Sequence, residues 1–323
     1  VKKCSEKNIK IEINTSERAL WNFEQFLYMM NLLRKYDVKY TIGSDAHAIE
    51  EIGTNYDKLN NYFKNRKREI EYSVISRGTE KSGSKGYMSI SKKIDDSRYL
   101  LVQDHKEKCI VSFKDSLKCY DYDINNISFS RFELIPTLVL NRNKFKDNIL
   151  ITGLGNIGIT TLIYLLDNNY NNIDIYTNDL SKYVIKGVNL LNEKYNVNIN
   201  LVEEINKEYN TYIDTTGVSA VLENIFNNIK FNKDIFLIGT PRESKFLIDP
   251  LLIHRNNLRI IGGHELRGID KTLRQDTFKE LLEKNSNKDY LNKLITISKY
   301  EEDIIERKLE TKSNFIEVIK YDD

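Results

Sequence analysis

The chain has 323 residues, of which 40% are hydrophobic and 30% are charged, and its formal net charge is +2. This length is enough for two or three domains with sizeable cores, and the hydrophobic content excludes a largely disordered protein. The balance of charges argues against a protein whose main role is to bind nucleic acid or a membrane surface.

The first residues of the chain predict a short α/β segment. Residues 8–14 alternate like a strand, residues 19–36 have helical periodicity, and residues 38–43 predict a second strand. The sequence SDAH follows this second strand, and a further helix is expected near residues 55–64. The charged run at 64–69 is either a solvated helix end or a junction between domains.

Residues 70–140 have a different pattern, which is typical of a small antiparallel β domain. Three short alternating segments in this region are separated by polar turns; they are IEYSVIS, RYLLVQ and KCIVSF.

Strand and helix patterns then alternate from residue 147 to residue 262, which predicts a parallel, doubly wound sheet. The strands are expected at 148–152, 173–177, 199–203, 211–215, 234–239 and 258–262, and the helices at 156–168, 181–195 and 218–229. A helix near 271–284 and strands near 293–298 and 315–320 complete the chain.

A glycine-rich turn joins the first strand of this predicted sheet to its first helix. In a G-x-G-x-x-G pattern, the first glycine permits a tight turn and the second lets the backbone approach a pyrophosphate. The third lets the helix pack closely on the strand. The amides and dipole of the helix N-terminus favour phosphates. A turn without a ligand is the alternative, but the context predicts a nicotinamide dinucleotide bound by Gly153, Leu154, Gly155, Asn156, Ile157 and Gly158.

The end of the next strand selects between NAD and NADP. Thr177 lies where NAD-binding proteins place an acid for the adenosine ribose, and Asn178, Asp179 and Lys182 follow it. A neutral residue with a nearby cation accommodates the 2′-phosphate of NADP, so NADP is favoured. NAD stays open because Asp179 is close enough in sequence to bind the ribose.

Two later strand ends are expected to line the same crevice. TYIDTTG ends in Thr215, Thr216 and Gly217, and DIFLIGTP contains Gly239 near its end. Ligands of doubly wound sheets bind outside the carboxyl ends of the strands. Each glycine alone is equally well explained as a helix or strand cap, but the aligned strand ends favour a shared site.

These segments resemble the medium-chain dehydrogenase/reductase superfamily, the relatives of zinc-type alcohol dehydrogenases. The resemblance implies a GroES-like β domain, a Rossmann domain and a C-terminal return to the β domain. It also implies an NAD(P)-dependent oxidoreductase that passes a hydride between nicotinamide and an alcohol or carbonyl carbon of a small molecule. It covers about residues 69–323 and rests on EIEYSVISRGTE (69–80), GLGNIG (153–158), YIDTTGVSAVLENIF (212–226), DIFLIGTPRE (234–243) and DPLLIHRNNLRIIGGHELRG (249–268).

The sequence departs from this family at the zinc sites. Ser76 stands near the position of a cysteine that binds the catalytic zinc, and the Gly-His-Glu segment that supplies another ligand has no match. The structural zinc lobe needs four closely spaced cysteines, whereas this chain has only Cys4, Cys109 and Cys119. We therefore expect no zinc, and either a zinc-independent enzyme or an inactive copy.

Without zinc, another group must polarise a carbonyl or stabilise an alkoxide. The candidate proton donors are Tyr87, His105, Thr79 and Glu80, although each of these residue types is more often structural. His264 is a candidate for the nicotinamide side of the cleft, and Arg267 and Arg274 are candidates for an anionic substrate or phosphate.

A second resemblance lies near the start of the chain. IEINTS (11–16) and YTIGSDAHAIEEIGTNYDKL (40–59) resemble the C-terminal third of PHP-type phosphoesterases, the histidinol-phosphatase-like enzymes, in which a D-x-H at a strand end supplies metal ligands. Asp45 and His47 take those positions, and such side chains suit a divalent metal that activates water. A complete site needs more histidines than the 4 in the chain. The site is expected to be incomplete here, with its missing half upstream of Val1.

Together these patterns predict an α/β protein with a Rossmann doubly wound parallel sheet, a small GroES-like β domain and an N-terminal partial PHP (β/α) segment. The domains are expected at 1–66 (PHP-like), 67–141 completed by 285–323 (GroES-like) and 142–284 (Rossmann). The expected function is a zinc-independent NAD(P)-dependent oxidoreductase. The alternatives are a nucleotide-binding module without turnover and a fragment of a bifunctional protein whose PHP part is a metal-dependent phosphoesterase.

The expected partners and location follow from composition and from the same resemblance. A small, odd number of cysteines and the lack of a long apolar run favour a cytoplasmic protein without a membrane partner. The substrate is expected to be a small molecule, and no nucleic acid is expected. The strand LRIIGG (258–263) is expected to pair across a two-fold axis, which predicts a homodimer.

Overall fold

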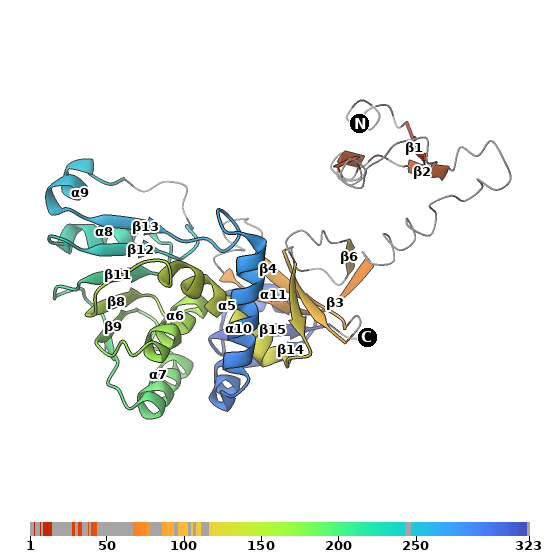
Figure 1. Ribbon diagram of the computed structural model, residues 1–323. Helices are drawn as coiled ribbons and strands as arrows, with labels where there is room; N and C mark the ends of the chain where they lie inside the picture. The colour runs from red at the N-terminus through yellow and green to blue at the C-terminus, as the bar shows by residue number, and fades with distance from the viewer. Residues whose placement is uncertain are drawn as a thin grey trace. The chain divides into compact units, whose positions relative to one another are not determined.

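Figure 1 shows the computed structural model of the chain, which divides into two compact units, Val1–Lys67 and Arg68–Asp323. In the described part of the chain, no helix is both long enough and apolar enough to cross a membrane. The structure describes residues 3, 7, 9–14, 28–29, 32–33, 38, 40–43, 67–77, 86–93, 96–102, 105, 108–110, 116–242 and 247–321.

The first unit contains a two-stranded parallel sheet. In this sheet β1 (Ile11–Asn14) pairs with β2 (Tyr40–Gly43), and both strands lie where the alternating pattern predicted them. The proposed metal ligands Asp45 and His47, and the helix expected near residues 55–64, lie outside the described residues.

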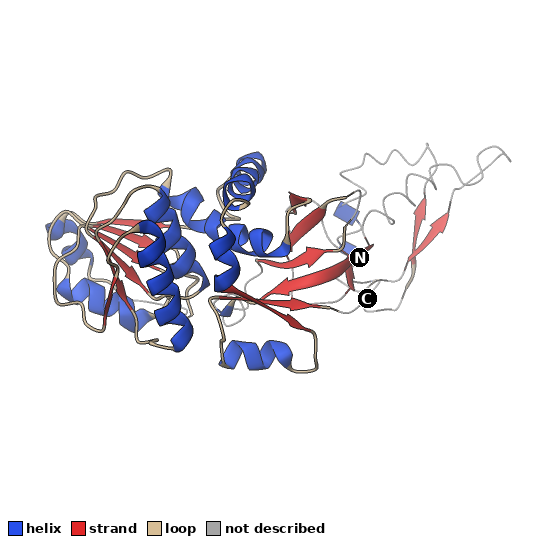
Figure 2. Ribbon diagram, turned by 90° about the horizontal axis from the view of Figure 1, so that it is seen from below, coloured by secondary structure: helices blue, strands red, loops and turns tan. Residues whose placement is uncertain are grey.

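The centre of the second unit is a six-stranded parallel sheet with the strand order β10-β9-β8-β11-β12-β13. This is the 3-2-1-4-5-6 order of a Rossmann domain. All residues of β8 and β11 are buried, as expected for strands whose two faces are both covered by helices (Figure 2). The strands are β8 (Ile149–Thr152), β9 (Ile173–Tyr176), β10 (Asn200–Val202), β11 (Thr211–Asp214), β12 (Asp234–Leu237) and β13 (Arg259–Gly262).

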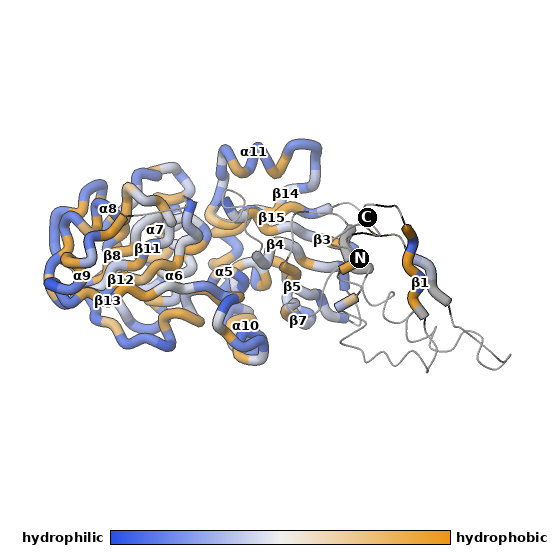
Figure 3. The backbone as a smooth tube through the Cα atoms, turned by 90° about the horizontal axis from the view of Figure 1, so that it is seen from above, coloured by the Kyte–Doolittle hydropathy of each residue, from blue (hydrophilic) through white to orange (hydrophobic). Residues whose placement is uncertain are grey.

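Each face of this sheet has its own hydrophobic core. Ile149 and Ile151 of β8 belong to the larger core, whereas Leu150 between them belongs to a smaller one. Alternate residues of a strand point to opposite faces, so consecutive residues of β8, Ile149 to Ile151, must all be apolar. In Figure 3 the strands carry mostly hydrophobic colours, and the surface helix α9 is mostly hydrophilic. The larger core includes α6 (Asn156–Asp167) and α7 (Lys182–Tyr195), and the smaller one includes α8 (Ser219–Asn228) and α9 (Pro250–Asn256).

The sequence analysis missed the helix α5 (Ile124–Leu140), because that region was interpreted as part of a β domain. Almost all of its residues are buried, including the charged residues Arg131 and Glu133. A helix that is buried all round has no amphipathic pattern from which it can be recognised. In Figure 1, α5 lies between the Rossmann sheet and the second sheet of the unit, and it packs against α6 and α10 (Lys271–Asn285).

The second sheet has seven strands and gathers segments from both ends of the unit. Its order is β14-β15-β3-β4-β5-β7, and β6 also pairs with β3. The C-terminal strand β15 pairs antiparallel with β3, so that Val318 lies opposite Val74. The remaining elements are β3 (Lys67–Val74), β4 (Tyr87–Ser91), β5 (Arg98–Val102), β6 (Lys108–Ile110), β7 (Leu117–Tyr120), the 3₁₀ helix η4 (Asp289–Leu294), β14 (Ile295–Lys299), α11 (Ile304–Glu310) and β15 (Ile316–Lys320).

A buried network of charges joins α5, α6 and α10. Glu133 is fully buried, and its two carboxylate oxygens accept hydrogen bonds from Lys284 Nζ at 2.7 Å and Asn285 Nδ2 at 2.6 Å. Lys284 and Lys288 also place their Nζ atoms 2.6 Å from Oδ2 of Asp167. Burial raises the pKa of Asp167, but the two lysines outweigh this effect and hold the pKa below its ordinary value. A buried carboxylate needs such partners, because its desolvation is otherwise uncompensated.

We predict that Glu133→Ala lowers the free energy of unfolding by about 3 kcal/mol, because it removes one partner from a buried ion pair. Urea unfolding followed by circular dichroism measures the change. Glu283→Ala is the matched control, since Glu283 is an exposed glutamate of α10 that pairs with Lys279 at 3.7 Å. Its loss is expected to change stability by less than about 1 kcal/mol. Equal effects of the two substitutions would contradict the role given to Glu133.

Candidate functional site

The turn after β8 has the conformation that the first glycine of the motif was expected to allow. Gly153 has a φ of +82°, which places it in the left-handed region that side-chain-bearing residues rarely adopt. Its backbone amide donates a hydrogen bond to the carbonyl oxygen of Tyr176 at 2.8 Å. A Cβ atom on Gly153 would come within 2.6 Å of Thr216 Cγ2. The turn therefore leaves no room for a side chain at this position.

The other two glycines of the motif have different surroundings. A Cβ atom on Gly158 would lie 2.3 Å from the carbonyl oxygen of Gly153, so this glycine lets α6 pack against the turn. A Cβ atom on Gly155 would meet nothing within 4 Å. Gly155 is also the N-cap of α6 and, as a glycine, has no side chain with which to cap this helix end. The turn therefore offers backbone amides and open space to an anionic group.

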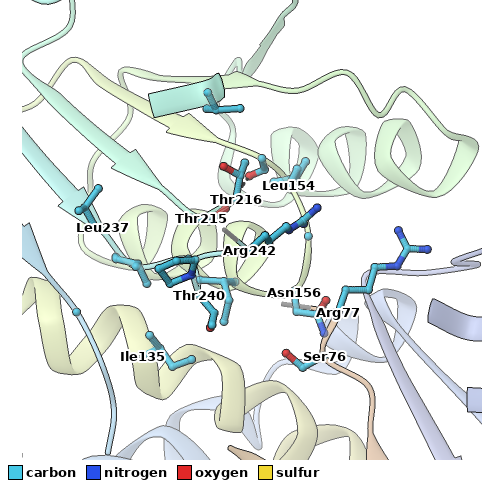
Figure 4. Close-up of a pocket in the computed structure, with 18 of the residues that line it drawn as sticks. Ser76, Arg77, Ile135, Leu154, Asn156, Thr215, Thr216, Leu237, Thr240 and Arg242 are labelled. Carbon is cyan, nitrogen blue, oxygen red and sulfur yellow. Dashed lines mark hydrogen bonds between the residues drawn. The ribbon is translucent and has the colours of Figure 1, made fainter. Parts of the chain in front are cut away.

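A cavity of about 830 Å³ opens beside this turn, at the carboxyl ends of the parallel strands (Figure 4). Most of the predicted cofactor residues line it: Gly153, Leu154, Gly155, Asn156, Ile157, Thr177, Asn178, Asp179, Thr215, Thr216 and Gly239. Three of them do not line it, namely Gly158, Gly217 and Lys182. The two glycines shape turns behind the wall, and Lys182 is exposed at the start of α7.

Asp214, at the end of β11, organises this wall, and the sequence analysis did not identify it. Its side chain is 1% exposed and accepts hydrogen bonds from the hydroxyls of Thr152 (2.7 Å) and Thr216 (2.6 Å). It also accepts bonds from the backbone amides of Thr216 and Gly217, each at 3.0 Å. Its backbone carbonyl accepts a bond from the amide of Gly239 at 2.9 Å. The carboxylate of Asp214 thus links the end of β8 to the turn after β11, and the backbone carbonyl of the same residue links this turn to the one after β12.

The end of β9 presents an ionised carboxylate to the cavity. Asp179 accepts hydrogen bonds from the backbone amide of Ser181 at 3.0 Å and from the hydroxyl of Tyr183 at 2.8 Å. Its own amide donates to the hydroxyl of Thr177 at 3.1 Å. Burial raises the pKa of Asp179, but these hydrogen bonds outweigh it and hold the pKa below the ordinary value. Asp179 is therefore charged at neutral pH and lies where a ribose ligand is expected.

Arg77, Arg242 and Lys312 also line the cavity, and the sequence analysis singled out none of them. In the view of Figure 4, Arg77 and Arg242 lie on either side of Asn156. Lys312 donates hydrogen bonds through Nζ to the side-chain oxygen of Asn156 and, at 3.2 Å, to the carbonyl oxygen of Phe315. These cations come from three distant parts of the chain, which is why no local pattern indicated them.

Lys312 has an unusual ionisation. Burial, supported by the charge of Arg77, lowers the pKa of this side chain to about 7, while the carboxylates of Glu317 and Asp179 oppose the shift. Such a lysine changes its charge near neutral pH, directly beside the N-terminus of α6.

The opposite end of the cavity is formed by α5 and the turn after β13. The residues there are Arg131, Ile135, Gly262, Gly263, His264, Glu265 and Arg267. His264 and Arg267, which were candidate site residues from sequence, therefore line the cavity. Arg131 lines it as well, but it belongs to α5, which was not predicted.

Tyr87 and His105, the two candidate proton donors, do not line the cavity. Tyr87 is fully buried in the hydrophobic core, and both ring nitrogens of His105 are buried as well. Arg274 is buried in α10 and does not line the cavity either. Thr79 and Glu80 lie outside the described residues. The geometry thus gives no support to Tyr87 or His105 as proton donors.

The side chains described around the cavity offer no complete set of zinc ligands. Ser76, at the position compared with a zinc-binding cysteine, lines the cavity together with Ile135. Zinc requires at least three sulfur, nitrogen or carboxylate donors from the protein. Within the described ranges, no three His, Cys, Asp or Glu side chains gather into a metal site.

Comparisons with known proteins identify the fold. No family model matches the chain, and no curated protein matches its sequence. S. aureus TarJ in complex with NADPH matches with a TM-score of 0.56 and 14% identity, over 80% of this chain and 92% of that one. The Salmonella enterica YhdH oxidoreductase in complex with NADP has a TM-score of 0.56 and 11% identity, over 79% and 90% of the two chains. The E. coli alcohol dehydrogenase RspB, complexed with NADH, has a TM-score of 0.58 and 12% identity, over 79% and 91%.

The likeness concerns the fold alone, because the sequence identities are low. It supports the mixed α/β architecture with a parallel Rossmann sheet that the resemblance to medium-chain dehydrogenase/reductases implied. It gives no support to the PHP-like interpretation of the N-terminal residues. The chain thus has, over about four fifths of its length, a fold that resembles those of these NAD(P)-bound proteins.

Proposed function

We propose that this chain is a zinc-independent, NAD(P)-dependent oxidoreductase of the medium-chain type. The observation that carries the proposal is the open glycine turn at Gly155, which faces a cavity of about 830 Å³ beside an uncapped helix N-terminus. Bound there, a nicotinamide dinucleotide supplies the hydride chemistry, in which a carbonyl compound, NADPH and a proton give an alcohol and NADP⁺, or the reverse.

The residues of the cavity fit the phosphates of a dinucleotide. The pyrophosphate would accept hydrogen bonds from the first amides of α6, next to Gly155. Arg77, Arg242 and Lys312 also line the cavity and would balance its charge. In this proposal these three side chains bind the phosphates and take no part in the transfer of the hydride to carbon or of the proton to oxygen.

The adenosine end would lie at the end of β9, and we propose a preference for NADP over NAD. Asp179 favours a ribose with two free hydroxyls, but Arg77 is close enough to lower its pKa. A 2′-phosphate near Asp179 would gain from Arg77, and from Arg242 and Lys312 beyond it. These three cations outnumber the single carboxylate of Asp179, so NADP, which carries the 2′-phosphate, is expected to bind more tightly than NAD.

The N-terminal residues and the oligomeric state remain separate proposals. We propose the domain division 1–66, 67–141 with 285–323, and 142–284, in which residues 1–66 derive from a PHP-like metal phosphoesterase. We also propose a homodimer through β13, which is the edge strand of the Rossmann sheet and whose residues Ile260 and Ile261 are only half-buried. Sedimentation equilibrium tests the dimer proposal, and a monomer mass at micromolar concentration would contradict it.

The proposal is tested by titrating the chain with NADPH and with NADH and following the fluorescence of the nicotinamide. NADPH is expected to bind more tightly than NADH. Gly155→Ala is expected to weaken both at least tenfold at unchanged melting temperature, because the methyl group occupies space that only the ligand needs. Gly158→Ala, by contrast, is expected to destabilise the fold by about 1–3 kcal/mol, since its Cβ would meet backbone.

Failure of both nucleotides to bind at millimolar concentration would remove the proposed function. Binding without turnover of any alcohol, aldehyde or ketone would instead support the alternative, a nucleotide-binding module. Stronger binding of NADH would reverse the cofactor preference and assign Asp179 to the ribose hydroxyls.

The pH dependence of binding tests the role of Lys312. Its ammonium form attracts the phosphates, and its pKa is lowered to about 7 in the unliganded chain. Binding therefore takes up a proton, and the affinity for NADPH is expected to fall about tenfold or more from pH 7 to pH 9. The 2′-phosphate, with a pKa of about 6, stays ionised throughout this range. Lys312→Met should bind more weakly at pH 7 and show a flat profile.

The control for this experiment is Lys299→Met, which removes an exposed lysine at the end of β14. This variant is expected to keep both the affinity and the slope of the parent. A slope that persists in Lys312→Met would show that another group takes up the proton.

A further inference from the structure

The cavity runs across the carboxyl ends of the Rossmann strands, from β9 at one end to β13 at the other. Asp179 follows β9, whereas Gly262 to Glu265 follow β13, and β8, β11 and β12 lie between these strands. Four strand spacings of about 4.8 Å separate the two ends, a distance of about 19 Å. If the adenosine lies at Asp179, the reacting end of the cofactor, and with it the substrate, lies toward β13 and α5.

At this second end, Arg131 is a buried cation that lines the cavity. Its side chain is 2% exposed. Its Nε donates a hydrogen bond to the carbonyl oxygen of Tyr87 at 2.7 Å, and its Cζ lies 4.2 Å from the centroid of the Phe132 ring. These two contacts hold the guanidinium in a fixed place between β4 and the cavity.

The outer nitrogens of Arg131 are poorly satisfied. Nη1 is buried and has no hydrogen-bond partner among the described residues. Nη2 lies 4.0 Å from Oε1 of Glu265, which is beyond hydrogen-bond distance. Glu265 in turn has its Oε2 atom 3.8 Å from Nδ1 of His264. The guanidinium is thus a charged group with several donors, of which one makes a hydrogen bond to a described residue.

A buried guanidinium in this state calls for an additional partner. An arginine side chain keeps its charge in proteins, so it cannot escape the desolvation penalty by losing a proton. A carboxylate at 4.0 Å gives Coulombic attraction without hydrogen bonds. The other titratable side chains described at this end of the cavity are Arg267 and His264, which add no negative charge.

We propose that Arg131 binds an anionic group of the substrate, so that the enzyme acts on an alcohol or carbonyl compound that carries a carboxylate or a phosphate. The two outer nitrogens present the parallel donors that recognise such groups in pairs. Arg131 is a substrate-binding residue in this scheme and takes part in no bond-breaking step. The inference rests on the proposed function, because it takes the cofactor to fill the end of the cavity at Asp179.

The first test measures anion binding to the full chain saturated with NADPH, by isothermal titration calorimetry. Saturation matters because it occupies the cations Arg77, Arg242 and Lys312. The probes are sodium oxamate, which carries a carboxylate, and inorganic phosphate. At least one of them is expected to bind, and Arg131→Met is expected to weaken that binding about tenfold or more. Preference for oxamate assigns a carboxylate substrate, and preference for phosphate assigns a phosphorylated one.

The matched control is Arg255→Met, which removes an exposed arginine of α9 that does not line the cavity. It should leave anion binding unchanged. Glu265→Gln should tighten anion binding, because it removes the negative charge beside Arg131 while keeping the shape of the side chain. Arg131→Met could fail to fold, because it removes the hydrogen bond from Arg131 Nε to the carbonyl oxygen of Tyr87. In that case Glu265→Gln still tests the inference.

The second test compares turnover of paired aldehydes that differ only in charge. Glyoxylate is compared with glycolaldehyde, and glyceraldehyde 3-phosphate with glyceraldehyde. The ratio of kcat/KM for the charged to the neutral member is expected to exceed one in the parent and to fall about tenfold or more in Arg131→Met. A purely structural role of Arg131 would lower both members of a pair equally.

The outcomes separate this inference from the function on which it rests. If NADPH does not bind, the oxidoreductase proposal fails, and the inference fails with it. If NADPH binds and neither anion binds, or if anions bind equally to Arg131→Met, only the role of Arg131 is overturned. Anion binding that disappears when NADPH is added would place the anion at the cofactor end and would also overturn it.

Discussion

The geometry of the cavity depends on the hydrogen bonds that the carboxylate of Asp214 accepts. This carboxylate is buried at the end of β11, and its oxygens accept hydrogen bonds from Thr152, Thr216 and Gly217. A buried carboxylate is stable only when such donors compensate its lost hydration. Here the donors are the ends of neighbouring strands and the turns that follow them. The same hydrogen bonds that keep Asp214 in the interior therefore hold the glycine turn after β8 beside the cavity.

The Rossmann sheet was predictable from sequence, whereas the helix beside it was not. Strands such as β8 carry consecutive apolar residues because both faces are covered, and helices such as α7 bury residues at helical spacing, as Val184, Val188 and Leu191 do. The glycine pattern and the strand ends then indicated many of the residues that line the cavity. In α5, however, Arg131 and Glu133 are buried together with the apolar residues, so the segment has no polar face to reveal a helix.

The charged groups of the site were the least predictable part, since they meet only through the tertiary fold. Arg77 follows β3, Arg242 follows β12, and Lys312 precedes β15. Lys182 was selected because it is near the strand end in sequence, yet it points to solvent at the start of α7. Local sequence thus indicates which turns approach a ligand, but two of the three cations that would bind its phosphates, Arg77 and Lys312, come from the second sheet.

The pairing of β3 with β15 explains how those charges reach the cavity. The two strands are antiparallel, with Val74 opposite Val318, so the end of β3 lies near the start of β15. Ile75 marks that end: its amide bonds the carbonyl oxygen of Glu317, and its own carbonyl accepts a bond from the Asn156 side chain at 2.8 Å. Lys312 bonds the same asparagine from the C-terminal side. Asn156 is the first residue of α6, so one side chain links the second sheet to the helix end that would bind the phosphates.

The pairing of the two strands also explains the lowered pKa of Lys312. The lysine is desolvated only when both sheets have formed, so the shift in its pKa is a consequence of folding. The site thus gains its positive charge from the fold of the whole unit. The stability of the unit and the affinity of the cavity for anions therefore depend on the same strand register.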